Sequence, residues 1–356
     1  MRKNDFIKIF EPAPPHYKDL ENFLKIIEDN GWFTNFGPLH DELIDKFSAY
    51  FGFPKSQIVL FPNATLAISG AISSLELKNK RWYVPSWTFT ATPLGIIFGG
   101  GDPHFVDVDK SGRADFEGKT GNFLEVLPFG DSLRGDILNS KFDYQVIDGA
   151  ASFDSLKGFT LPQNRPVGVV VSLHATKLMS TGEGGVFITN DQSWANRVRA
   201  WTRFGFEGGE RISKSIGINA KFSEYQAAVG LASFKNWPSH RLRITELNKK
   251  VLDITLNNGF EPSPASTKGF ATPYWIIKTS GIDQKNNLVE QFSRLKIETR
   301  NWWESGCADM PAFSKFVRED MVNTKKISNE LIGLPFHLNL SEKDLEKIDY
   351  ALSLSR

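Results

Sequence analysis

Short runs of β-branched and aromatic residues alternate with helix-like segments over the first two-thirds of the chain. Seven of these runs have the length and composition of buried strands: QIVLF (57–61), RWYVP (81–85), PHFVDVD (103–109), NFLEVLPF (122–129), YQVID (144–148), GVVVSL (168–173) and GVFITN (185–190). Helices are expected between several of them, among them 65–77 and 89–98. This alternation is typical of a mostly parallel sheet with helices on both faces.

The pattern changes after about residue 235. The elements predicted there are, in chain order, a helix (239–257), a Pro/Ser/Thr/Gly-rich segment (261–269), a strand (270–279), a helix (284–295), a strand (296–303) and a terminal helix (342–354). We therefore predict an α/β fold with two domains. The large domain (1–236), which includes an amino-terminal arm, holds a mostly parallel seven-stranded sheet flanked by helices. The small carboxy-terminal domain (237–356) is α+β.

Composition and charge narrow the classes of function. The 356 residues include 42 Lys and Arg against 41 Asp and Glu, so the charge balance indicates neither a nucleic acid nor an anionic membrane as partner. The single cysteine, Cys307, excludes an internal disulfide framework and a cysteine-based zinc site, and no metal site is predicted. Proline residues interrupt the amino terminus, and no apolar run has the length of a signal peptide or a membrane span. We expect a cytoplasmic globular enzyme.

Several common catalytic motifs are missing from the sequence. The segment GRADFEGKT (112–120) ends like a phosphate-binding P-loop but has five residues between its glycines instead of four, so a surface turn is the better interpretation. The patterns HExxH, paired CxxC, GxSxG and GxGxxG do not occur. Zinc proteolysis, serine hydrolase chemistry and a standard dinucleotide site therefore lose support.

The segment VVVSLHATKLMSTGEGGVFIT (169–189) carries candidate chemistry. A buried-type strand ends at Ser172, and Lys177 follows before a glycine-rich turn. Ligands bind at the carboxyl ends of strands in α/β sheets. Between Ser172 and the apolar Leu178 and Met179, a lysine is placed for desolvation, which lowers the pKa of an amine and makes it a nucleophile toward carbonyl carbon. The alternative is a solvent-exposed loop lysine.

Two further strand ends carry matching chemistry. Asp148 ends the strand YQVID, where a carboxylate needs a cationic partner such as a protonated pyridine nitrogen, although an N-cap role is the alternative. The segment FPNATLAISGAISSL (61–75) starts a helix at Asn63, Ala64 and Thr65, and the N–H groups and dipole at such a start bind anions. A lysine, an aspartate and a phosphate cradle on three strand ends together indicate pyridoxal 5′-phosphate (PLP).

The chain resembles the DegT/DnrJ/EryC1/StrS family of PLP-dependent sugar aminotransferases, which have the aspartate-aminotransferase fold. The resemblance spans nearly the whole length and rests on six segments in the family's order: NFGPLHDEL, NATLAISGAI, VPSWTFTATPLGIIFGGGDPHFVDVD, VIDGAASF, SLHATKLMSTGEGG and GINAKFSEYQAAVGL. The GEGG after the lysine and the GINAKFSEYQAA block are the most specific.

The resemblance implies roles at the reacting centre. Lys177 forms the Schiff base with PLP and, once displaced by the amino donor, acts as the base that moves the proton between substrate and cofactor carbons. Asp148 pairs with the pyridine nitrogen. Phe89 matches the aromatic residue that stacks on the ring, with a core position for Phe89, or Trp87 in its place, as alternatives. Relatives that deoxygenate sugars have histidine in place of the lysine, so Lys177 favours amino transfer.

The resemblance also implies how the phosphate is held. Ala64 and Thr65 match the backbone cradle, and Ser172 donates its hydroxyl to the phosphate, although it could instead merely cap the strand. Asn219 matches an asparagine that reaches the phosphate from the neighbouring subunit, which implies a homodimer with shared sites. Ala151 stands where relatives commonly carry Gln or His near the ring hydroxyl, so that contact is absent or made by another residue.

The function implied is transfer of an amino group from L-glutamate to a keto group of a nucleotide-linked 6-deoxyhexose, best dTDP-4-keto-6-deoxy-D-glucose, for surface polysaccharide or glycoside synthesis. A 3-keto-sugar, a UDP-linked keto-sugar, PLP chemistry of another reaction type, and a non-catalytic regulatory relative are the alternatives. Arg300, Trp302 and Trp303 are candidate substrate-side residues, because they combine a fixed cation with stacking surfaces. Packing at a domain interface is the equal alternative for the two tryptophans.

Overall fold

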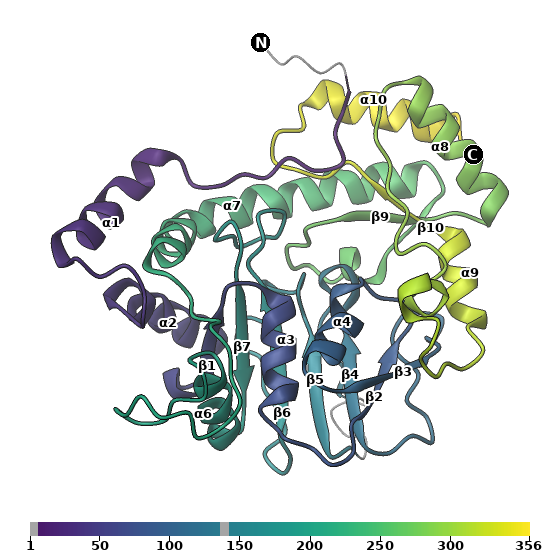
Figure 1. Ribbon diagram of the computed structural model, residues 1–356. Helices are drawn as coiled ribbons and strands as arrows, with labels where there is room; N and C mark the ends of the chain where they lie inside the picture. Colours follow the sequence, from purple (N-terminus) through teal and green to yellow (C-terminus); the bar gives the residue numbers. More distant parts are fainter. Residues whose placement is uncertain (1–5, 136–141) are drawn as a thin grey trace.

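The computed structural model describes residues 6–135 and 142–356 (Figure 1). Its large sheet has seven strands in the order β1-β7-β6-β5-β4-β2-β3. Their bounds are β1 Ile58–Phe61, β2 Arg81–Pro85, β3 Asp102–Val106, β4 Asn122–Val126, β5 Tyr144–Asp148, β6 Val167–Ser172 and β7 Gly185–Thr189. Strands β3, β2, β4, β5 and β6 run parallel, and β7 is antiparallel to both β6 and β1. The predicted mostly parallel seven-stranded sheet is confirmed.

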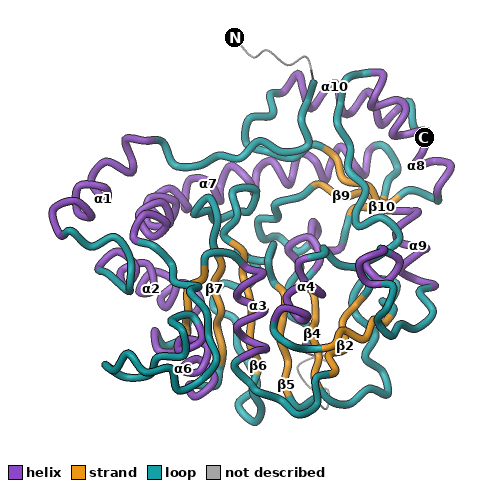
Figure 2. Tube along the Cα trace, viewed as in Figure 1, coloured by secondary structure: helices purple, strands orange, loops and turns teal. Residues whose placement is uncertain are grey.

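Both faces of this sheet are covered, which is why its strands are rich in apolar residues (Figure 2). Along β6, Val169 and Val171 belong to the core shared with helices α2 (Pro38–Phe51) and α7 (Glu224–Asn257). Val170, between them, belongs to the core on the opposite face. That face is covered by α3 (Ala64–Ser73), α4 (Ala91–Phe98) and α6 (Gln192–Trp201).

A second, three-stranded antiparallel sheet lies in the carboxy-terminal part, in the order β10-β9-β8. Its strands are β8 (Glu261–Pro262), β9 (Trp275–Lys278) and β10 (Leu331–Leu334). The remaining α-helices described are α1 (Tyr17–Asn30), α8 (Ile282–Arg294), α9 (Val322–Glu330) and α10 (Glu342–Ser353). No helix in the described ranges has both the length and the apolar character needed to cross a bilayer.

The strand expected over 296–303 is wrong. Ile297 makes one bridge with Ile7, and Arg300 makes one with Gly333 on β10, but no ladder joins the two points. Between Ile297 and Arg300 the segment leaves the amino-terminal arm and reaches β10. The two tryptophans that follow then pack within an aromatic cluster. Strand β9 also begins later than expected, after Pro273, which lacks the N–H that a ladder needs.

Helix α7 is one element of 34 residues, which begins well before the helix expected over 239–257. Its start is fixed by a capping box in which Ser223 accepts the N–H of Gln226 and the Gln226 side chain accepts the N–H of Ser223. Pro238 lies inside the helix. The proposed domain boundary at residue 236 therefore falls within a continuous helix.

Glu224 ties two of the recognised segments together. Its carboxylate, 1% exposed, accepts the N–H groups of Leu39 at 2.8 Å and His40 at 2.9 Å, at the start of α2. A Cβ on Gly37 would lie 2.6 Å from the Glu224 carboxyl carbon, so only glycine leaves room for this approach. The NFGPLH and KFSEYQ segments thus form one capping interaction between α2 and α7.

We expect Glu224→Ala to lower the free energy of unfolding by about 2–4 kcal/mol, because it leaves two N–H groups of a buried helix start without an acceptor. Chemical denaturation of the variant and the wild type measures the difference. Glu246→Ala, an exposed glutamate on the same helix, is the matched control and should change stability by less than about 0.5 kcal/mol. Equal effects of the two substitutions would contradict the capping role.

Candidate active site

The start of α3 lies against the end of β6 through a single glycine. Gly185 pairs with Phe61 on β1 and with Ser172 on β6, so the three residues form one row across the sheet. A Cβ on Gly185 would lie 2.8 Å from the backbone nitrogen of Ala64. Only glycine allows β7 to approach the helix start this closely. Ser172 and the first turn of α3 therefore share one edge of the sheet.

This edge offers a set of hydrogen-bond donors. The side chain of Asn63 accepts the N–H of Leu66 at 2.9 Å, and the Asn63 carbonyl accepts that of Ala67. In the described structure, the first-turn N–H groups left for an anion are those of Ala64 and Thr65. Ser172 Oγ accepts the N–H of His174 at 3.2 Å, which leaves its own O–H as a donor. The arrangement has the chemistry of a phosphate site.

Asp148 is a buried carboxylate at the end of β5. It accepts the hydroxyl of Thr92 at 2.7 Å and the N–H of Ala150 at 3.0 Å, and the Thr92 hydroxyl lies 2.7 Å from that of Thr88. Burial raises the pKa of Asp148, and these hydrogen bonds and the charge of Lys177 oppose the rise. A cation bonded to the carboxylate would offset its desolvation, and a protonated pyridine nitrogen is such a cation.

Lys177 is partly buried and follows the end of β6 in a tight turn. Its backbone N–H donates to the His174 carbonyl at 2.9 Å, and Thr181 N–H donates back to Leu173 at 2.9 Å. The amine Nζ donates to the hydroxyl of Tyr274 at 2.6 Å. Lys177 is therefore not a freely solvated loop lysine, because its amine contacts Tyr274, a buried residue next to the small sheet that is 7% exposed.

Phe89 and Trp87 have opposite surroundings. Trp87 is 1% exposed and packs edge-on against Trp303, with ring centroids 5.3 Å apart. Phe89 is 53% exposed. In sequence it lies between Thr88 and Thr92, whose hydroxyls are linked by hydrogen bonds to Asp148. Phe89 therefore has a ring that can cover a ligand, whereas Trp87 is committed to the core.

Asn219 lies in an exposed segment between α6 and α7. Its side-chain oxygen accepts the amine of Lys221 at 2.6 Å, and its described contacts do not include Asp148, Ser172 or Lys177. Asn219 is exposed, and Ile216, three residues before it, is 85% exposed. Its reach into a neighbouring subunit stays a prediction.

The two tryptophans lie in an aromatic cluster. Trp302 is 7% exposed, and its ring centroid lies 5.2 Å from that of Tyr274. Trp303 stacks on Phe129 at 5.1 Å with 9° between the rings. The guanidinium of Arg300 is exposed and covers Trp302 at 4.7 Å. These contacts favour the packing alternative for the tryptophans, while Arg300 stays accessible to a substrate.

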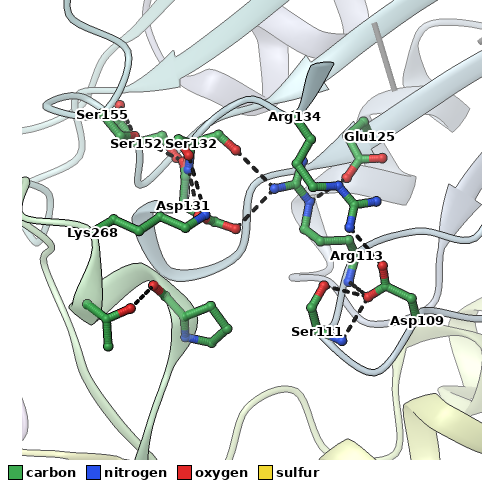
Figure 3. Close-up of polar contacts among 12 residues, drawn as sticks. Asp109, Ser111, Arg113, Glu125, Asp131, Ser132, Arg134, Ser152, Ser155 and Lys268 are labelled. Atoms are coloured by element: carbon green, nitrogen blue, oxygen red, sulfur yellow. Dashed lines mark hydrogen bonds and ion pairs between the residues drawn. The ribbon is translucent and has the colours of Figure 1, made fainter. Parts of the chain in front are cut away.

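A buried charged cluster fixes the loop that carries Phe129 (Figure 3). Arg113, 1% exposed, donates to Glu125 at 2.8 Å and to Asp131 at 3.1 Å. Lys268, from beyond β8, also pairs with Asp131. Burial raises the pKa of Glu125, and the Arg113 charge opposes that rise. The cluster joins the chain after β4 to the carboxy-terminal part beside the candidate site.

Sequence reasoning missed three contributors: Thr88, Thr92 and Tyr274. The i, i+4 spacing of the two threonines, at the start of a helix that follows a strand end, is the one signal that could have found them. Tyr274 contacts Lys177 across 97 positions of sequence, and its segment has no motif that points to this contact.

Comparisons with known proteins identify the family of this chain. Residues 16–116 and 165–353 match the model of the DegT/DnrJ/EryC1/StrS aminotransferase family. The chain belongs to this family. It is 27% identical over 361 residues to a dTDP-4-amino-4,6-dideoxy-D-glucose transaminase of Shigella dysenteriae, with 96% of this chain and 97% of the relative covered.

Solved structures show the same fold. DesI, determined in the presence of its TDP-sugar product, matches with a TM-score of 0.84 at 22% identity, over 99% of this chain and 93% of DesI. A DegT/DnrJ/EryC1/StrS aminotransferase from Brucella abortus matches with a TM-score of 0.81 at 20% identity, over 94% and 95% of the two chains. The family resemblance, the fold class and the PLP-dependent aminotransferase class are confirmed.

The residues present fit the family's cofactor. PLP has a phosphate, a pyridine nitrogen and an aldehyde, and the sheet edge offers a helix start with a hydroxyl, a buried carboxylate and an amine. The ring nitrogen would give the buried Asp148 carboxylate a cationic partner, and the close approach that Gly185 permits brings the first turn of α3 to the edge that would hold the phosphate. The described residues of this DegT/DnrJ/EryC1/StrS aminotransferase therefore include groups that fit the phosphate, the ring nitrogen and the aldehyde of PLP.

We expect Gly185→Ala to weaken PLP binding by at least tenfold, because the new Cβ must displace the start of α3. Titration of the cofactor-free protein with PLP, followed by absorbance, measures the affinity. Gly209→Ala places its Cβ in open space and is the control, expected to leave the affinity unchanged. If both variants bind PLP like the wild type, the phosphate is not held at this helix start.

Asp148→Asn tests the buried charge by its pH dependence. A raised pKa means that this carboxyl contributes its full stability below the unfolded-state pKa and loses it as pH rises through the folded-state pKa. The cofactor-free wild type should therefore lose thermal stability relative to Asp148→Asn as the pH rises above the ordinary aspartate pKa of about 4. Thermal midpoints across this range measure the difference, with exposed Asp253→Asn as control. Parallel curves for wild type and Asp148→Asn would contradict the assignment.

Proposed function

We propose that this family member transfers the amino group of L-glutamate to the keto group of dTDP-4-keto-6-deoxy-D-glucose, in the synthesis of a surface polysaccharide or glycoside. The observation that carries the proposal is the pair of Lys177 and Asp148 at neighbouring strand ends, with a phosphate cradle beside them. The name of the Shigella dysenteriae relative supports the choice of substrate.

Each residue of the pair has a defined task. When bound, PLP supplies a carbonyl that takes and returns the amino group and a ring that accepts electrons. Lys177 would bind the cofactor covalently, and once the amino donor has freed its amine, Nζ would carry a proton between the substrate carbon and the cofactor carbon. Asp148 holds the ring cation, because its carboxylate is buried and needs a positive partner.

The remaining residues bind and orient. Ala64, Thr65 and Ser172 hold the phosphate, and Phe89 covers the ring. Asn219 reaches the phosphate of the neighbouring subunit in a homodimer. Exposed apolar side chains beside Asn219 support such an interface: Phe204, Ile216 and Ile218, which are 43%, 85% and 38% exposed.

Arg300 is the substrate-side residue that we favour, since a guanidinium binds diphosphate oxygens in bidentate geometry. The Arg300 guanidinium lies on the ring of Trp302, which limits its movement. Trp302 in turn packs against Trp303, and Trp303 stacks on Phe129. This arrangement suits a dTDP-, UDP- or GDP-linked sugar equally. A UDP-linked or 3-keto acceptor is therefore the second candidate, and the acceptor panel below separates them.

A regulatory relative without activity is less well supported. A pure binding protein has no use for a strand-end lysine held beside a buried carboxylate, and both are retained here. Hydrogen bonds also link the Thr88 and Thr92 hydroxyls to the Asp148 carboxylate and hold it in place.

We expect the protein loaded with PLP to show a visible absorption band that is lost on adding L-glutamate and restored by dTDP-4-keto-6-deoxy-D-glucose. Lys177→Ala should lose the band, because it removes the amine that binds PLP covalently. Lys235→Ala, an exposed lysine of α7, is the control and should behave as the wild type.

Each outcome has a meaning. Faster restoration by a UDP-linked or 3-keto sugar would keep the aminotransferase and change the acceptor. A wild-type band that L-glutamate does not alter, with other amino acids equally inert, would favour the regulatory alternative.

A further inference from the structure

Tyr274 contacts the amine of Lys177 from outside the large sheet. The two side chains meet at 2.6 Å between Tyr274 Oη and Lys177 Nζ, the one hydrogen bond described for this hydroxyl. Tyr274 directly precedes β9, whereas Lys177 follows β6. The carboxy-terminal part of the chain therefore supplies a polar group to the amine on which the proposed chemistry depends.

The ring of Tyr274 is held from three sides by other rings. Its centroid lies 5.2 Å from that of Trp302, 5.7 Å from that of Phe10 and 6.1 Å from that of Phe129, and all three pairs are edge-to-face. Such pairs are favourable, and together they leave the 7%-exposed ring little freedom to rotate. The hydroxyl is thus held in place before any ligand binds.

A phenol hydroxyl can both accept and donate a hydrogen bond. It accepts a hydrogen bond from a lysine ammonium through its lone pairs, and it donates a hydrogen bond through its O–H to a neutral amine. The same contact can therefore persist when Lys177 Nζ gains or loses a proton. An apolar neighbour of the same shape could hold the amine in neither state.

We propose that Tyr274 is a positioning residue that holds Lys177 Nζ at the reacting edge of the sheet in both of its protonation states, after the amino donor has freed the lysine. This inference rests on the proposed role of Lys177 as the proton-transferring base. The step itself is a proton transfer: Nζ would take a proton from the substrate carbon, become an ammonium, and pass that proton to the cofactor carbon. Tyr274 neither loses nor gains a proton in this step.

The test compares Tyr274→Phe, which keeps the packed ring and removes only the hydroxyl, with Tyr50→Phe. Tyr50 also donates one hydrogen bond through its hydroxyl, to Asp154 at 3.2 Å, in a different part of the chain. For Tyr274→Phe we expect kcat to fall about 10- to 100-fold with KM for L-glutamate within about twofold of the wild type. The variant should also show a larger kinetic isotope effect with α-deuterated glutamate, because proton transfer becomes slower than the other steps.

A second readout needs no cofactor. Acylation of the cofactor-free protein with an amine-specific reagent, followed by mass spectrometry, reports how free each lysine is to react. We expect Lys177 to react at least threefold faster in Tyr274→Phe, since the hydrogen bond no longer restrains its amine, and Lys235 to react at the wild-type rate. Tyr50→Phe should leave both rates unchanged.

Three results would overturn the inference: an unchanged isotope effect, an unchanged Lys177 acylation rate, or equal losses of kcat in Tyr274→Phe and Tyr50→Phe. The failure of the proposed function is a different observation. It would appear in the wild type, as a visible band that L-glutamate does not alter, whereas a responsive wild type with an equally responsive Tyr274→Phe would remove only the role of Tyr274.

Discussion

The site depends on one electrostatic constraint, a carboxylate buried at a strand end. Burial of Asp148 disfavours its charged form, and the hydroxyl of Thr92 and the N–H of Ala150 compensate only in part. A cation in contact with the carboxylate completes the compensation. The buried carboxylate therefore favours a positively charged ring at this edge of the sheet, where Lys177 and the start of α3 also lie.

Close backbone approach is the second requirement, and it explains the family segments physically. Gly185 lets the start of α3 lie on β7, and Gly37 lets the Glu224 carboxylate reach the start of α2. In both cases a helix start meets an element from a distant part of the chain. The GEGG and NFGPLH segments therefore serve contacts between elements, not local turns alone.

The sequence predicted the large sheet well because its strands are short runs rich in apolar residues between turn residues, as in β6. Asp148 and Ser172 could be proposed because they end such runs, and Lys177 because it follows shortly after β6. Tyr274 could not, because its role arises from packing against rings far away in sequence. The segment 296–303 was mistaken for a strand for the same reason: its aromatic residues satisfy a cluster, which composition cannot distinguish from a ladder.

Helix α7 has a consequence for how the chain can vary in length. At its start, Glu224 is fixed to α2, and further along Ile244 and Val251 pack into the same core as Trp275 of β9. One residue added between these points would rotate everything beyond it by about 100° and advance it by about 1.5 Å. Loops elsewhere can absorb insertions, but an insertion within this helix would shift the carboxy-terminal part, which carries Tyr274, relative to the large sheet, whose strand β6 precedes Lys177.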